Sequence, residues 1–195
     1  MMIRSRWNSL KQIGCRFLRN REGVAAVEMA LVTPVLLLLF CGGGEMGFYL
    51  QAHFRTAQMA STVADVVARY ENVTSSDISS IFAVSSEVMG DDDFDDHGYV
   101  ILTSVKREGG KAATVSWQCE AGAYENSSRI GSINKQAELP NDLPLTANDN
   151  VIVAEVFYHY TPIFTSVVAV NPLLYKTAVF RPRLGDLTAA PGCNT

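Results

Sequence analysis

The sequence predicts an α+β fold in which a long N-terminal helix packs on a small antiparallel sheet of about four strands, with a short second helix between them. An uncharged apolar segment, a helical pattern that continues beyond it, and four β-type runs near the end lead to this prediction. Apolar residues make up 48% of the 195 residues, which suffices for a core and argues against disorder. We therefore expect three regions: a basic segment (1–23), a long helix (24–70) and an α+β domain (71–195).

Charge is divided unevenly along the chain. Residues 1–22 carry six basic side chains against Glu22 alone, whereas the remainder carries ten basic and nineteen acidic side chains. A basic start on an acidic body argues against a general nucleic-acid-binding protein. It suits a short tail held at the cytoplasmic face of a membrane.

The apolar segment predicts the membrane topology. No residue from Met29 to Gly44 is charged, and counted from Val24 the segment is 21 residues long. As a helix it would extend about 31 Å, which matches the hydrocarbon core of a bilayer. The basic residues before it place the N-terminus in the cytoplasm by the positive-inside rule. We expect a single-pass inner-membrane protein whose C-terminal domain lies in the periplasm.

Two other interpretations of this segment are open. An ordinary secretory signal peptide also has a basic start and an apolar middle, and the small residues Cys41 to Gly44 resemble a cleavage region. A plain single-pass anchor without any processing is the second alternative.

The helical pattern continues beyond the membrane segment to about Tyr70. A narrow, alanine-rich stripe recurs at three- and four-residue spacing and is expected to face the sheet; it comprises Leu50, Phe54, Ala57, Ala60, Ala64 and Val67. Pro34 and the glycines at 42–44 predict a kink or local melting. Gly43 and Gly47 form a GxxxG spacing, a hint of close helix contact.

A second, short helix is predicted after this point. Thr74 and Asp77 resemble a capping box, and apolar residues follow at helical spacing up to Gly90. The acidic run Asp91 to Asp96 then offers clustered carboxylates of the kind that bind calcium. It lacks the spacing of a calcium-binding loop, and we interpret it as a solvated, flexible turn.

Four strands are expected in the second half: Tyr99–Val105, Thr114–Cys119, Val151–Tyr160 and Tyr175–Arg181. The Gly109-Gly110 turn makes the first two a hairpin. Residues 120–150 are polar, contain two prolines, and are interpreted as a surface excursion.

The cysteines fall into two groups. Cys15 and Cys41 lie before or within the apolar segment, whereas Cys119 and Cys193 lie far downstream. In an exported domain the downstream pair can form a disulfide, and that is the prediction; both unpaired, or a bond to another subunit, are the alternatives. No Cys/His cluster has the spacing of a zinc site.

Glu28 is the charged residue that interrupts the apolar segment. A carboxylate at bilayer depth is costly and is usually functional and paired; a merely interfacial position is the alternative. Residues 21–35, REGVAAVEMALVTPV, resemble the TadE-like family: a glycine, small residues, a Val-Glu run, a proline and a leucine-rich tract. The family usually has an aromatic residue after the glutamate, where this chain has Met29. The segments at 158–164 and 180–183 resemble the family's late strand and closing basic segment.

This resemblance implies a pilin-like fold and a minor pilin or pseudopilin of a tight-adherence (Flp-type) pilus. By it, residues 1–23 form a leader peptide that a prepilin peptidase removes between Gly23 and Val24. The new amine at Val24 would then pair with Glu28 of its own or a neighbouring chain. The implied partners are the peptidase, other pilin-like subunits and the assembly machinery in the inner membrane.

No enzyme is expected, and no cofactor or metal. The three histidines, His53, His97 and His159, lie in no recognisable nucleophile motif, and no phosphate-binding glycine loop is present. The main alternative from another class is an unprocessed, membrane-anchored periplasmic module for ligand binding or adhesion. It predicts that Glu28 is dispensable.

Overall fold

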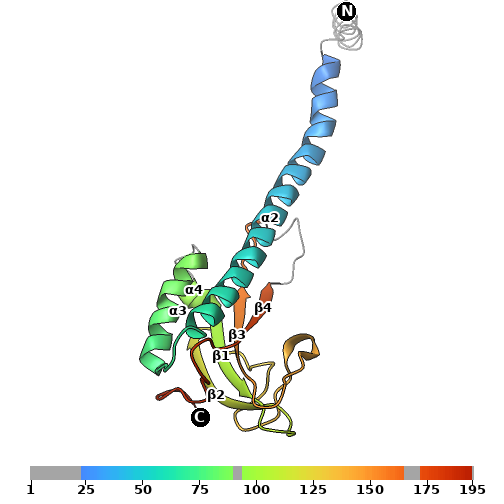
Figure 1. Cartoon of the computed structure of the whole chain (residues 1–195). Helices are drawn as coiled ribbons and strands as arrows, with labels where there is room; N and C mark the ends of the chain where they lie inside the picture. The colour runs from blue at the N-terminus through green and yellow to red at the C-terminus, as the bar shows by residue number, and fades with distance from the viewer. Residues whose placement is uncertain (1–22, 90–93, 165–171, 195) are drawn as a thin grey trace, which may run out of the picture.

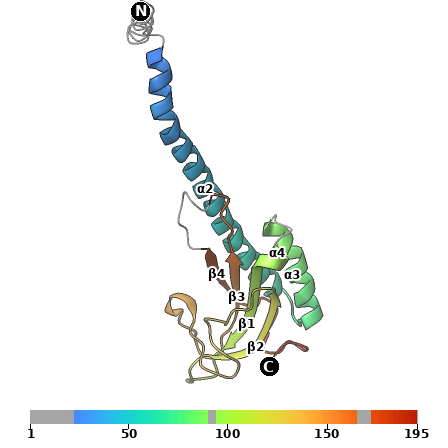
Figure 2. The same ribbon diagram turned by 180° about the vertical axis from the view of Figure 1, so that it is seen from behind.

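The computed structural model describes residues 23–89, 94–164 and 172–194. Helix α2 (Val24–Val67) forms a long stalk whose C-terminal part lies against a sheet (Figures 1 and 2). The other elements follow in chain order as α3 (Ser75–Met89), α4 (Phe94–His97), β1 (Gly98–Lys106), β2 (Thr114–Gly122), η2 (Pro140–Asp142), β3 (Asn150–His159) and β4 (Leu173–Phe180). The predicted α+β class, with a long helix, a short second helix and four antiparallel strands, is confirmed.

The sheet has the strand order β2-β1-β3-β4, and every neighbouring pair is antiparallel. The hairpin of β1 and β2 pairs Leu102 with Cys119 and has a register shift at Ser104/Val105. The central strands β1 and β3 are buried along nearly their whole length. Because their side chains alternate between the two faces, both faces of the sheet must be covered.

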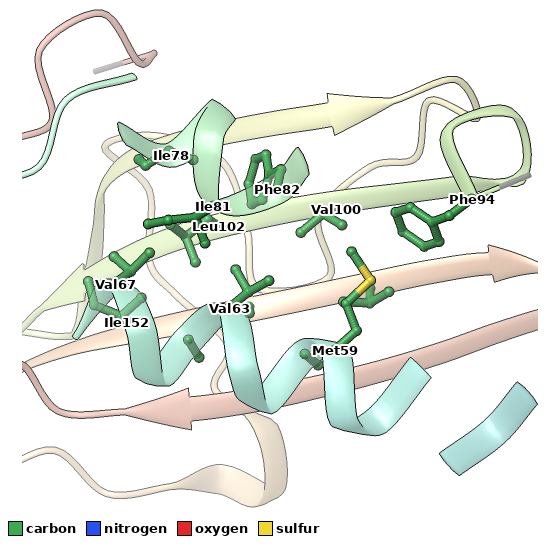
Figure 3. Packing of buried hydrophobic residues seen from close by; sticks show 14 of the residues in the cluster. Met59, Val63, Val67, Ile78, Ile81, Phe82, Phe94, Val100, Leu102 and Ile152 are labelled. Atoms are coloured by element: carbon green, nitrogen blue, oxygen red, sulfur yellow. The ribbon is translucent and has the colours of Figure 1, made fainter. Parts of the chain in front are cut away.

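Helices α2 and α3 cover one face of the sheet. Met59, Val63 and Val67 of α2 meet Val100 and Leu102 of β1 and residues of α3 in one cluster (Figure 3). The predicted capping box at the start of α3 is formed. The Thr74 N–H and hydroxyl donate to Asp77 Oδ2 over 2.9 and 2.7 Å, and the Asp77 N–H donates to Thr74 Oγ1 over 3.3 Å.

The stripe predicted to face the sheet is partly wrong. Ala60, Ala64 and Val67 are buried, but Leu50 and Phe54 are 49% and 73% exposed, and Ala57 is exposed too. The buried side of α2 instead comprises Glu45, Ala52, Thr56, Met59, Ala60, Val63, Ala64 and Val67. Apolar residues occur on two sides of this helix, so their spacing alone does not decide which side meets the sheet.

The predicted local melting of α2 is also wrong. The helix is continuous through Pro34 and the glycines at 42–44 and curves gently along its length (Figures 1 and 2). A single proline removes one hydrogen bond, and the long run of apolar, helix-forming neighbours keeps the remaining ladder intact. No described residue approaches the position that a Cβ would take at Gly43 or Gly47, so the GxxxG spacing serves no contact among the described residues.

Residues 123–149 do more than make a surface excursion. Ile130 and Leu145 are buried against Val105, Val115, Val151 and Val153, which together form a second apolar cluster. This segment is mostly polar and has few apolar residues, so its composition did not indicate that it contributes to the core.

The acidic run is also more structured than predicted at its end. Phe94–His97 forms the short helix α4, whereas Asp91 to Asp93 lie outside the described residues. Phe94 is buried and stacks on Tyr158, with ring centroids 6.1 Å apart. A Cβ at Gly98 would lie 2.3 Å from the Phe94 ring, so this contact requires glycine.

The C-terminal segment is bonded both to β2 and to the end of α2. Cys119 of β2 and Cys193 are joined by a disulfide, and Gln118 and Asn194 exchange two backbone hydrogen bonds beside it. At the end of α2, the Arg183 N–H donates to Ala68 O over 2.8 Å and its guanidinium pairs with Asp65.

Candidate functional site

Residues 24–40 of α2 are apolar apart from Glu28 and Thr33, and all of them are exposed. Leu31 and Phe40 are 72% and 80% exposed. The most apolar 18-residue window of the helix has a mean hydropathy of 2.4, and none of it is buried. Such a run is unfavourable in water, and its length and composition suit a membrane span.

Gly23, Val24 and Glu28 lie together at the start of this helix. Gly23 is its N-cap residue, with φ −81° and ψ −16°, and Val24 is its first helical residue. Glu28 follows four residues later, which puts it on the same face as Val24. Its side chain is exposed, and no described side chain pairs with it. Cleavage after Gly23 and charge pairing by Glu28 remain predictions.

A second carboxylate, Glu45, follows directly after the apolar segment, and its side chain is fully buried. The Tyr160 hydroxyl donates to its Oε1 over 2.6 Å, and the backbone N–H groups of Ile163 and Phe164 donate to its Oε2 over 3.1 and 3.0 Å. These four residues are called the Glu45 cluster below. They attach the segment after β3 to the helix at the end of its apolar half.

The surroundings of Tyr160 keep the cluster in place. The ring centroids of Tyr160 and Tyr49 lie 5.4 Å apart in an edge-to-face arrangement, and the Tyr160 backbone N–H donates to Pro172 O over 2.7 Å. Burial, followed by the neighbouring Glu45 carboxylate, raises the pKa of the Tyr160 hydroxyl. The hydroxyl therefore keeps its proton and can donate to Glu45 at any physiological pH.

Sequence reasoning missed the Glu45 cluster. A usable signal was present, since Glu45 is the first charged residue after the apolar run. Its partner Tyr160 lies 115 residues away, within the late segment that resembles the family. Nothing in the sequence joins the two positions.

The three histidines all contact tyrosine rings, and His97 and His159 share one of them. His53 packs edge-on against Tyr49 at 4.6 Å, whereas His97 and His159 each stack with Tyr124, at 6.2 and 5.5 Å. Within the described ranges, no group of three or more His, Cys, Asp or Glu side chains could hold a metal ion. The ring contacts of these histidines serve packing.

The helix that carries the predicted cleavage glycine, Glu28 and Glu45 also carries the match to a known family. Residues 23–65 match the family model described as TadE-like protein. The predicted resemblance is thereby confirmed for this segment, which begins at the N-cap glycine and ends two residues before α2 does. Comparisons with curated proteins and with solved structures gave no match. The likeness to the TadE-like family is limited to α2 and its N-cap, and the sheet lies outside the matched range.

Proposed function

We propose that this protein is a minor pilin or pseudopilin that takes part in assembly of a tight-adherence (Flp-type) pilus. The observation that carries the proposal is the TadE-like match, which coincides with the exposed apolar half of α2. That half has the composition of a membrane span, and the sheet domain is attached to the other half of the same helix. The role is structural: α2 packs with the helices of other pilin-like subunits, and the domain is presented outside the membrane.

In this proposal, residues 24–44 cross the inner membrane with the N-terminus in the cytoplasm and the sheet domain in the periplasm. A prepilin peptidase cuts between Gly23 and Val24 at the cytoplasmic side. Three features support this site: the basic residues before it, the lack of a Cβ at Gly23, and the start of the helix at Val24.

The test is the mature N-terminus, measured by intact mass and N-terminal sequencing of the full chain recovered from membranes that contain a matching prepilin peptidase. We expect a start at Val24. An intact Met1 would favour the unprocessed anchored module for binding or adhesion. A soluble product that starts near Gly44 would show an ordinary exported protein.

A matched pair of glycine variants makes this test specific. A Cβ at Gly23 or at Gly44 would meet no atom of the described residues within 4 Å, so neither Gly23→Leu nor Gly44→Leu should disturb their packing. Gly23→Leu should abolish the cut, because the added side chain blocks close approach of the peptidase to the backbone. Gly44→Leu should be cut like the parent protein.

A further inference from the structure

The segment that Glu45 holds exposes apolar side chains beside the end of the apolar half of α2. Ile163 and Phe164 are 64% and 39% exposed, and Phe48, three residues after Glu45, is 49% exposed. The backbone N–H groups of Ile163 and Phe164 nevertheless have an acceptor in Glu45. Because these backbone N–H groups already have an acceptor and the side chains are apolar, the segment suits surroundings that are poor in water.

The depth of this segment follows from the helix. If residues 24–44 span about 31 Å, Glu45 comes at the point where the hydrocarbon core gives way to the headgroups. Because the Glu45 cluster bonds Ile163 and Phe164 to that position, both residues lie at the level of the membrane surface.

The local charge also favours an apolar neighbour. The sequence carries no Lys, Arg, Asp or Glu between Glu155 and Lys176. Tyr49 and Tyr160 lie at the same level, and tyrosine is enriched where a protein crosses from lipid to water.

We propose that Ile163 and Phe164 insert into the periplasmic surface of the bilayer, so that lipid is the partner of this exposed patch. The inference rests on the proposed membrane anchoring by α2. The patch provides a second attachment of the domain to the membrane, and Glu45 is the positioning residue that holds it there. Together with the helix, this attachment restricts the tilt of the sheet domain relative to the membrane.

The test uses single tryptophan substitutions in the full chain, reconstituted in vesicles of phosphatidylethanolamine and phosphatidylglycerol. Phosphatidylcholine brominated near the top of its acyl chains is then added as a quencher. Ile163→Trp should show blue-shifted emission, measured against the parent protein, and loss of most of the added fluorescence with brominated lipid. Leu184→Trp is the matched control, because Leu184 is 61% exposed and follows Arg183, which bonds to Ala68 at the far end of α2. Its emission should be unaffected.

A third variant separates failure of this inference from failure of the proposed function. Leu39→Trp reports on the span itself, since Leu39 is 68% exposed within the apolar half. Quenching at position 39 but none at position 163 would overturn the surface contact alone. No quenching at either position would overturn the membrane anchoring as well. A blue shift at position 163 that increases with the protein-to-lipid ratio and is not quenched by brominated lipid would show that a second copy covers the patch. That result would overturn the proposal.

Discussion

Two carboxylates on α2 illustrate how a charge is accommodated at the two ends of one apolar segment. Glu45 accepts three hydrogen bonds from its own chain and is fully buried. Glu28 is exposed on an apolar surface, and the described part of the chain supplies it with no partner. The first arrangement is complete within the monomer, whereas for the second we propose the new amine at Val24, of the same or a neighbouring chain, as the partner.

Glu28→Ala should therefore spare both processing and folding but impair assembly. The exposed side chain contributes no packing, so the thermal midpoint of the domain should not change, while the cationic amine loses its counter-charge. Pilus formation by cells that carry the variant measures the effect, with a peptidase assay alongside. Glu28→Asp keeps the charge and should retain more assembly than the alanine variant. Normal pili with Glu28→Ala would refute the charge pairing.

Tyr160→Phe tests the Glu45 cluster with the smallest possible change. It removes one donor to the Glu45 carboxylate and keeps the ring contact with Tyr49, so the domain should lose about 2 kcal/mol of stability. Glu45→Ala should cost more, because it leaves the Tyr160 hydroxyl and the N–H groups of Ile163 and Phe164 without their acceptor.

Denaturant unfolding of the full chain in detergent and hydrogen exchange at the Ile163 and Phe164 amides check both variants. Faster exchange confined to these amides is expected for Glu45→Ala. Unchanged exchange would show that Glu45 does not hold the segment.

At the scale of elements, the C-terminal segment connects β2, α3 and α2. It pairs with β2 beside the disulfide, its Pro191 carbonyl accepts from Ser75 at the start of α3, and Arg183 bonds to the end of α2. The disulfide closes a sequence separation of 74 residues, so its removal frees a long loop in the unfolded chain.

Cys119→Ser and Cys193→Ser should each destabilise the domain by about 4–5 kcal/mol on the chain-entropy model, and by equal amounts because either change breaks the same bond. Denaturant unfolding with and without a reductant measures this. Cys41→Ser is the control, since Cys41 is a free cysteine in the apolar half of α2, and it should have no such effect. Unequal losses, or free thiols at both positions in the exported protein, would contradict the intramolecular bond.

At the scale of the whole molecule, patterns within short windows predicted the main helices and strands, but they did not predict the packing. Alternation and turn residues predicted each strand to within three residues at either end, and Thr74 with Asp77 marked the start of α3. The outward direction of Phe54 and the burial of Ile130 depend on contacts between distant segments. The same holds for the Glu45 cluster, which joins α2 to the segment after β3.

For the candidate site, the local motif around Gly23 and Glu28 was readable because residues 23–65 keep the features of a known family. The surface at Ile163 was not, because an exposed isoleucine after a strand carries no signal of its own. Its meaning comes only from the position of Glu45 at the end of the apolar segment.

The two sides of the C-terminal half of α2 lead to a last prediction. Met59 is fully buried against the sheet, whereas Phe54 is 73% exposed on the side that faces away from it. In the proposed assembly α2 packs with other helices, and a large aromatic side chain left exposed on it is suited to an interface between subunits. Phe54→Ser should therefore leave the stability of the domain unchanged but weaken copurification with other pilin-like subunits.

Met59→Ala is the contrasting variant on the buried side. It should cost about 2–5 kcal/mol of stability, and any loss of assembly should follow from that destabilisation. Unfolding and crosslinking in membranes, measured on both variants, separate the two effects. Full crosslinking by Phe54→Ser would show that this side of α2 faces solvent rather than a neighbouring helix.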